Sequence, residues 1–248
     1  MPRLHSLAGI ALLLAAPAAL RPTTILAVRS GDRILLAADS RVSIHRGRET
    51  AASTGCKIHL THGIAWAQTG FVFNTRSGFD LESTGTRALA ATGTFDDRVQ
   101  TLAAAVNEPL HRALLALYEQ DRQSYYEMVE TPLAIFAAGV AEDAPVLAVV
   151  EFARAESGRL SHKIYRCPGD CSSKVLYLSG GMHQEADRLV DSTPALFTRQ
   201  DWTEGLRMLL DAETAENPRY VGAPYSMVEI RPSGIQWLDR GACADGSR

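Results

Sequence analysis

The chain has 248 residues, of which 46% are hydrophobic and 21% are charged, and these proportions are typical of a globular protein with a full core. Its formal net charge is −3, and the basic and acidic residues are scattered rather than gathered into long runs. We therefore expect no nucleic acid and no anionic membrane surface as partner. After removal of a leader, the chain would be long enough for one large α/β domain or two small ones.

The sequence starts with MPRLHSLAGIALLLAAPAALRP, which has the three parts of a secretory signal. Arg3 supplies a positive charge, an apolar stretch covers 7–14, and Ala-Pro-Ala at 16–18 offers a small-x-small cleavage site. An uncleaved anchor is the alternative, but the apolar stretch is short for crossing a bilayer. We expect a signal peptide over 1–18, a short pro-segment over 19–22, and a soluble mature protein that is secreted or periplasmic.

Four cysteines fit the oxidising compartment that such a leader implies. Cys167 and Cys171 stand in CPGDC, where Pro-Gly-Asp can form the turn that brings them together. A metal site would need further ligands, for which His162 and His183 are the only nearby candidates, and the spacing matches no common zinc pattern. We therefore expect a disulfide at this turn. The other two cysteines could pair with each other or stay free: Cys56 and Cys243.

The first predicted elements are two strand hairpins. TILAVR (24–29) and RILLAAD (33–39) are apolar runs separated by Ser-Gly-Asp, which is a turn signal. KIHL (57–60) and IAWAQT (64–69) are separated by Thr-His-Gly in the same way. The first two runs are apolar on successive rather than alternate residues, so we expect both faces of those strands to be covered.

Helices are predicted next, over Phe71 to about Glu82 and from about Asp96 onward. The second helix has one apolar stripe, and Pro109 interrupts its hydrogen bonding and could kink it. The stripe consists of Val99, Leu102, Val106, Leu110, Ala113, Leu114 and Leu117. Further strands are predicted over 133–140, 145–153, 162–166 and 174–179, followed by helices over about 184–192 and 201–216 and a closing hairpin of SMVEIRP and GIQWLD.

This order alternates groups of strands with pairs of helices. Strands covered on both faces, with paired helices between them, predict two stacked sheets enclosed by helix layers. The expected fold class is therefore α/β (α+β), a four-layer αββα sandwich. We expect one domain over 23–240 and a C-terminal tail over 241–248.

Common catalytic signatures are absent from the sequence. It contains no G-x-S-x-G, no Walker loop, no G-x-G-x-x-G and no H-E-x-x-H. The seven histidines have no metal-ligand spacing. We expect neither a metal nor a cofactor, and a conventional Ser-His-Asp hydrolase is a distant alternative.

The stretch TTILAVRSGDRILLAADSR resembles the opening of mature proteasome β subunits and of HslV-like peptidases. The shared pattern is a doubled threonine, an apolar strand, a glycine-containing turn and a second apolar strand that ends in Asp-x-Arg. It continues through CKIHL and WAQTGF, so the resemblance covers about residues 23–71. It implies the four-layer fold of the N-terminal-nucleophile hydrolases, with hydrolysis of peptide or small amide bonds and no cofactor. We expect a stand-alone homo-oligomer.

The resemblance implies a role for four residues. Thr23, as the first residue of the mature chain, would be the nucleophile, with its own α-amine as the base. Because such an amine has a pKa of about 8, a nearby cation would help to keep it neutral. Lys57 would supply the cation, Asp39 would hold Lys57, and the N–H of Gly70 would face the oxyanion. We expect Lys57→Ala to abolish hydrolysis and to leave the fold nearly intact, because Lys57 begins a strand.

Each of these residues also has an ordinary structural explanation, which the sequence leaves open. Thr23 could simply begin a strand and Asp39 could be a turn residue. Lys57 could be a solvated strand end, and Gly70 could be a glycine at a helix entry.

Three departures from the family pattern keep a second class of function open. The residue before the threonine is Pro22 rather than glycine, and cleavage after Ala18 would leave Ala-Leu-Arg-Pro ahead of the amine. The family's Asp-x-x-Ser is replaced within NPRYVGAPY by Pro218 and Val221, with Asn217 as a partial substitute. Its Gly-Ser-Gly turn becomes Ser-Gly-Gly at 179–181. The alternative is a catalytically inactive, proteasome-like scaffold or ligand-binding protein.

Overall fold

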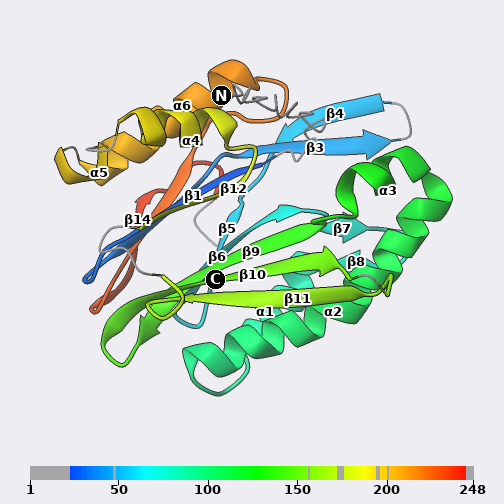
Figure 1. Ribbon diagram of the computed structural model, residues 1–248, viewed down its shortest axis with the longest axis horizontal. Helices are drawn as coiled ribbons and strands as arrows, with labels where there is room; N and C mark the ends of the chain where they lie inside the picture. Colours follow the sequence, from blue (N-terminus) through cyan, green and yellow to red (C-terminus); the bar gives the residue numbers. More distant parts are fainter. Residues whose placement is uncertain are drawn as a thin grey trace, which may run out of the picture.

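The computed structural model describes residues 23–46, 49–155, 157–171, 176–193, 196–199 and 201–243. The predicted signal peptide and pro-segment lie outside the described residues. Figure 1 shows two sheets stacked face to face between two layers of helices.

The first sheet has the strand order β12-β1-β2-β13-β14. Its neighbouring strands are antiparallel, and β1 lies between β2 and β12. The strands are β1 (Thr24–Arg29), β2 (Ile34–Ala38), β12 (Leu176–Gly181), β13 (Ser226–Arg231) and β14 (Gly234–Asp239).

The second sheet has the strand order β11-β10-β9-β6-β5 and is also antiparallel. Its strands are β5 (Ile58–Thr61), β6 (Ile64–Gly70), β9 (Leu133–Ala141), β10 (Ala144–Arg154) and β11 (Leu160–Cys167). Two small hairpins lie outside the sheets: β3 (Arg41–Arg46) with β4 (Glu49–Thr54), and β7 (Phe73–Asn74) with β8 (Phe79–Asp80).

The helices form the two outer layers, with α4, α5 and α6 on the sheet of β1 and β12 and with α1 and α2 on the other sheet (Figure 1). The first group is α4 (Gln184–Ser192), α5 (Leu196–Arg199) and α6 (Trp202–Glu216). The second is α1 (Leu81–Leu89) and α2 (Phe95–Gln120), followed by α3 (Arg122–Met128). The predicted four-layer sandwich is confirmed.

Apolar cores separate the layers, and β1 shows why its residues are apolar in succession. Ile25 faces the core between the sheets, whereas the next residue, Leu26, packs in the core beneath α6. On the second sheet, Phe136 lies in the central core, while Ile135 packs under α2. Because both faces of these strands are covered, both alternating sets of side chains must be apolar.

Helix α2 has the stripe that the sequence predicts, and its residues are buried against the second sheet. It begins with a capping box in which Thr94 and Asp97 satisfy one another's backbone N–H groups. The helix continues through Pro109 to Gln120.

The predicted helix over 71–82 is wrong. That segment forms the β7–β8 hairpin, and α1 starts only at Leu81, with Asp80 as its N-cap. Asn74 accepts the N–H of Ser77 in the turn, and Gly78 has a φ of 69°. The turn at Asn74 and Gly78 joins two short strands, and the cap at Asp80 starts the helix only at Leu81.

All four cysteines form disulfides. Cys167 and Cys171 are bridged, as predicted, and Cys56 is bridged to Cys243 across a separation of 187 residues. None of the helices in the described ranges combines the length and the apolar character needed to span a bilayer.

Candidate active site

The two threonines at the start of β1 are fixed by the backbone that follows β12. The carbonyl oxygen of Thr23 accepts the N–H of Met182 at 2.7 Å, and the hydroxyl of Thr24 donates to the carbonyl oxygen of Met182 at 2.5 Å. Thr24 also pairs with Gly181 in the sheet register. Thr23 itself is buried. The backbone at the predicted nucleophile is therefore held by residues distant in sequence.

Asp39 follows β2, and its fully buried carboxylate accepts hydrogen bonds from four N–H donors. One oxygen accepts the N–H of Thr24 at 2.8 Å and the ammonium of Lys57 at 2.7 Å. The other accepts the N–H groups of Arg41 at 2.9 Å and Gly222 at 3.3 Å. Asp39 thus joins the start of β1 to Lys57, which a surface turn residue would not do.

Lys57 lies just before β5, and only 6% of its side chain is exposed. Burial lowers the pKa of Lys57, and the charge and hydrogen bond of Asp39 oppose that effect only in part. The structure therefore differs from a solvated strand end. It also changes the expectation for Lys57→Ala, because removing a buried cation would leave Asp39 unpaired.

Gly70 ends β6 but does not open a helix, so that part of the prediction is wrong. The N–H of Phe71 donates to the carbonyl oxygen of Pro132 at 2.7 Å. Gly70 and Leu133, one step earlier in the register, therefore form a non-hydrogen-bonded pair. The N–H of Gly70 consequently points away from β9, as an oxyanion donor would need.

Thr69 brings this part of β6 close to the first threonine. Gly181 has a φ of 80°, and a Cβ there would overlap the carbonyl oxygen of Thr23 and lie 2.7 Å from the hydroxyl oxygen of Thr69. Only glycine fits this position. The close approach of three chain segments here places Gly70, the neighbour of Thr69, on the same side of the site as Thr23.

The loop after α6 packs on the Asp39 side of the site. Its Gly222 bonds to Asp39, and its Pro218 carbonyl oxygen accepts a guanidinium N–H of Arg41 at 2.5 Å. The amide of Asn217 donates to Glu213 at 2.7 Å. The loop therefore supports Asp39 through backbone groups, and the side chain of Asn217 is engaged elsewhere.

The serine of the Ser-Gly-Gly turn lies away from the start of β1. Ser179 is opposite Leu26 in the β1–β12 register, two positions from the Thr24–Gly181 pair. Met182, whose N–H donates to the carbonyl oxygen of Thr23, has no hydroxyl. The serine hydroxyl is therefore displaced from the start of β1, in agreement with the change from Gly-Ser-Gly to Ser-Gly-Gly in the sequence.

Some groups at the site carry no sequence signal of their own. Met182 and Gly222 contribute backbone atoms, and Thr69 contributes a hydroxyl whose oxygen is buried and has no hydrogen-bond partner among the described residues. Only the glycine spacing near 181 and 222 could have pointed to a close backbone approach. Within the described ranges, no group of three or more His, Cys, Asp and Glu side chains is placed to hold a metal ion.

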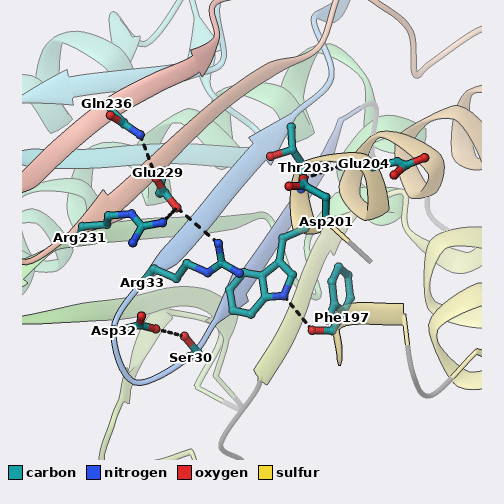
Figure 2. Close-up of polar contacts among 11 residues, drawn as sticks. Ser30, Asp32, Arg33, Phe197, Asp201, Thr203, Glu204, Glu229, Arg231 and Gln236 are labelled. Carbon is teal, nitrogen blue, oxygen red and sulfur yellow. Dashed lines mark hydrogen bonds and ion pairs between the residues drawn. The ribbon is translucent and has the colours of Figure 1, made fainter. Parts of the chain in front are cut away.

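A second buried carboxylate, Glu229, lies at the opposite end of β2 (Figure 2). Arg231 lies 2.8 Å and Arg33 lies 3.7 Å from one of its oxygens, and Gln236 donates to the other at 2.9 Å. The guanidinium of Arg33 also stacks on Trp202, 3.9 Å from the ring centroid. Both arginines are partly exposed, and Glu229 raises the pKa of Arg231.

Solved structures with the same architecture include two of Anbu, an ancestral β-subunit. The protein from Yersinia bercovieri has 12% identity and a TM-score of 0.53, with 87% of each chain covered. A Gly-1 mutant from Hyphomicrobium sp. strain MC1 has 12% identity and a TM-score of 0.55, covering 88% of this chain and 87% of that one. HslV from Trypanosoma brucei has 16% identity and a TM-score of 0.46, covering 84% of this chain and 99% of that one.

No protein-family model and no curated protein sequence matches this chain. The Anbu structures show that its fold is that of the proteasome-like N-terminal-nucleophile hydrolases. In fold, the resemblance to proteasome-like β subunits that residues 23–71 indicated is therefore confirmed.

Proposed function

We propose that this protein is an N-terminal-threonine hydrolase that cleaves peptide or amide bonds, with Thr23 as its nucleophile. The observation that carries the proposal is the carboxylate of Asp39, which binds both the N–H of Thr24 and the ammonium of Lys57. This arrangement holds a cation and the residue after the nucleophile on one buried group, beside the start of β1.

In the proposed reaction, the hydroxyl of Thr23 attacks the substrate carbonyl while the α-amine of Thr23 takes its proton. Lys57, held by Asp39, lowers the proton affinity of that amine and stabilises the forming alkoxide. The N–H of Gly70 donates to the oxyanion. Collapse of the tetrahedral intermediate breaks the C–N bond, the protonated α-amine gives its proton to the leaving amine, and water then hydrolyses the ester on Thr23.

The proposal includes secretion and processing. Residues 1–18 would be removed as a signal peptide and 19–22 as a pro-segment, leaving a mature domain over 23–240. The two disulfides support an oxidising compartment outside the cytoplasm. We further propose that the mature protein is a stand-alone homo-oligomer with a peptide or small amide substrate.

The decisive experiment is mass mapping of the mature N-terminus, combined with turnover of a broad panel of peptides and amides. We expect the active wild type to begin at Thr23 and Thr23→Ala to be inactive. The matched control is Thr24→Ser, which keeps both the backbone N–H that binds Asp39 and the hydroxyl that binds Met182, and it should retain most activity. A fully active wild type that begins at Ala19 would end the threonine mechanism.

The second candidate function is an inactive scaffold or a ligand-binding protein. It is favoured by Pro218 and Val221, which replace the ionisable and hydroxyl groups of the family pattern, and by the bond of Asn217 to Glu213. A wild type that begins at Ala19 and hydrolyses nothing would support this candidate.

A further inference from the structure

A cavity of about 430 Å³ lies between the two sheets beside the candidate site. Its volume is in the range of about 300–1,000 Å³ that is usual for small-molecule pockets. It runs along β12, with Gly181 and His183 at one end and the Cys167–Cys171 turn at the other. Because β12 and β11 are both edge strands, the cavity lies between the edges of the two sheets.

The middle of this cavity is apolar. Leu176, Leu178 and Gly180 share one face of β12, and Phe136 and Val149 line the opposite wall. Four residue steps along β12 correspond to about 13 Å. That length exceeds the reach of an ordinary apolar amino-acid side chain, so the cavity suits a longer chain.

Polar groups are placed toward the ends of the cavity. Glu151 lies in the same cross-strand row as Ala134 and Thr69, and Asp170 is in the turn at the far end. Lys163 is opposite Glu151, and its ammonium lies 4.4 Å from the centroid of the Tyr165 ring. The acidic groups therefore have a cation of the protein near them, which offsets their charge.

At the Thr23 end, the cavity contains an unsatisfied polar group. Thr69 is 2% exposed, lines the cavity, and has a buried hydroxyl oxygen that finds no hydrogen-bond partner in the part of the chain that the structure describes. Such a group costs free energy unless a ligand or water satisfies it. A substrate amide at this end would provide both a donor and an acceptor, close to the carbonyl oxygen of Thr23.

We propose that this cavity binds the long apolar acyl chain of an amide substrate, with the amide group beside Thr69 and the chain extended along β12. The proposal rests on the proposed hydrolase function and names its substrate class, an N-acylated amine. The chain would pack against Leu178, Phe136 and Val149, and the scissile amide would remain at the start of β1.

The test measures binding without turnover. Acetamide, hexanamide and decanamide are titrated by calorimetry into Thr23→Ala, which keeps the cavity and lacks the nucleophile. We expect affinity to rise about three- to fourfold for each added methylene that the cavity buries. Thr69→Val in the same background should weaken decanamide binding about two- to tenfold by removing the hydroxyl.

Cavity-filling variants locate the bound chain. Val149→Phe should remove the dependence of affinity on chain length, and Leu178→Phe, on the half-exposed edge strand, serves the same purpose if the first variant does not fold. Leu115→Phe, a similar change on an exposed face of α2, should leave binding unchanged.

The outcomes separate this proposal from the function on which it rests. Affinity that is independent of chain length in Thr23→Ala, or unaffected by the filling variants, overturns the cavity proposal even if the wild type cleaves peptides. Chain-length-dependent binding that the filling variants abolish supports the acyl cavity, even if the wild type proves to be inactive and the hydrolase proposal fails.

Discussion

A buried carboxylate with basic partners lies near each end of β2: Asp39 directly after the strand, and Glu229 of β13 opposite Leu35. The basic partners of the two carboxylates differ in exposure. Asp39 is paired with Lys57, whose side chain is 6% exposed, whereas the partners of Glu229 are Arg33 and Arg231, at 31% and 44%. Burial lowers the pKa of Lys57, whereas the bond to Glu229 raises that of Arg231.

This difference separates a desolvated cation from solvated ones. A buried lysine loses its proton more readily than an exposed one, and such perturbed pKa values are common at active sites, where a buried charge also acts more strongly on neighbouring groups. A solvated arginine stays charged and gains little from its ion pair. The Glu229 cluster therefore serves as an internal control for the candidate site.

The largest expected effect is on stability, where loss of the cation beside Asp39 should cost more than loss of one beside Glu229. Lys57→Met leaves Asp39 buried without a cation and should lower the free energy of unfolding by about 3–5 kcal/mol. Arg231→Met should cost much less, because the arginine is exposed and Arg33 remains. Urea denaturation of both variants measures this difference, and equal losses would show that the burial of Lys57 has no energetic consequence.

A second prediction concerns the covalent bond beside the Asp39 end. Cys56 precedes Lys57, and its bridge to Cys243 should contribute about 2–4 kcal/mol. Replacing both cysteines with serine should lower thermal stability accordingly. The control is the corresponding double variant of the Cys167–Cys171 turn, which closes a much shorter loop and should cost less. A larger loss in the control would reverse the expected order.

The pH profile of hydrolysis tests the lowered pKa under the proposed function. The reaction needs charged Lys57. As the pH rises, kcat/KM should therefore fall when Lys57 loses its proton, and because its pKa is lowered, this fall should come before the pH reaches about 10.4, the ordinary lysine pKa. Lys57→Arg keeps its charge at those pH values, so any remaining activity should lose this alkaline limb. Arg231→Lys is the control and should keep the wild-type limb; the same limb in Lys57→Arg would assign it to another group.

The smallest expected effect is on salt dependence. Ions screen exposed charges more strongly than buried ones, so 1 M sodium chloride should reduce the already small stability difference between the wild type and Arg231→Met. The difference between the wild type and Lys57→Met should remain nearly constant. Denaturation at low and high salt gives both values, and a larger change for Lys57 would mean that water reaches its ion pair.

The sequence predicted the elements with long apolar runs or stripes and missed elements that lack them. Helix α2 and the first two hairpins follow from apolar runs or stripes. Helix α3 buries none of its residues, so it has no pattern that burial would impose. The β3–β4 hairpin has few apolar residues in its sequence, RVSIHR and ETAAST, and no long apolar run. The helix predicted over 71–82 failed because turn chemistry at Asn74 and Gly78 and the cap at Asp80 prevail over the local pattern.

At the site, the sequence indicated the side chains but not the backbone that holds them. Asp39 and Lys57 could be named because they stand at family-like positions after recognisable strands. Met182 and Gly222 could not, because they contribute N–H and C=O groups that every residue has, and only the fold brings them near Asp39 and Thr23. The burial of Lys57 was likewise invisible, since it results from packing between distant segments.

The Cys56–Cys243 bridge converts most of the domain into a covalent ring, with residues 23–55 as an arm outside it. A protease that cuts any single loop within the ring leaves both new ends attached to one molecule, and the fragments separate only after reduction. A cut in the arm between Asp39 and Cys56 instead removes the covalent link between Thr23 and Asp39 on one side and Lys57 on the other. Nicked protein of the first kind can keep the candidate site whole, whereas the second kind of cut divides it between two chains.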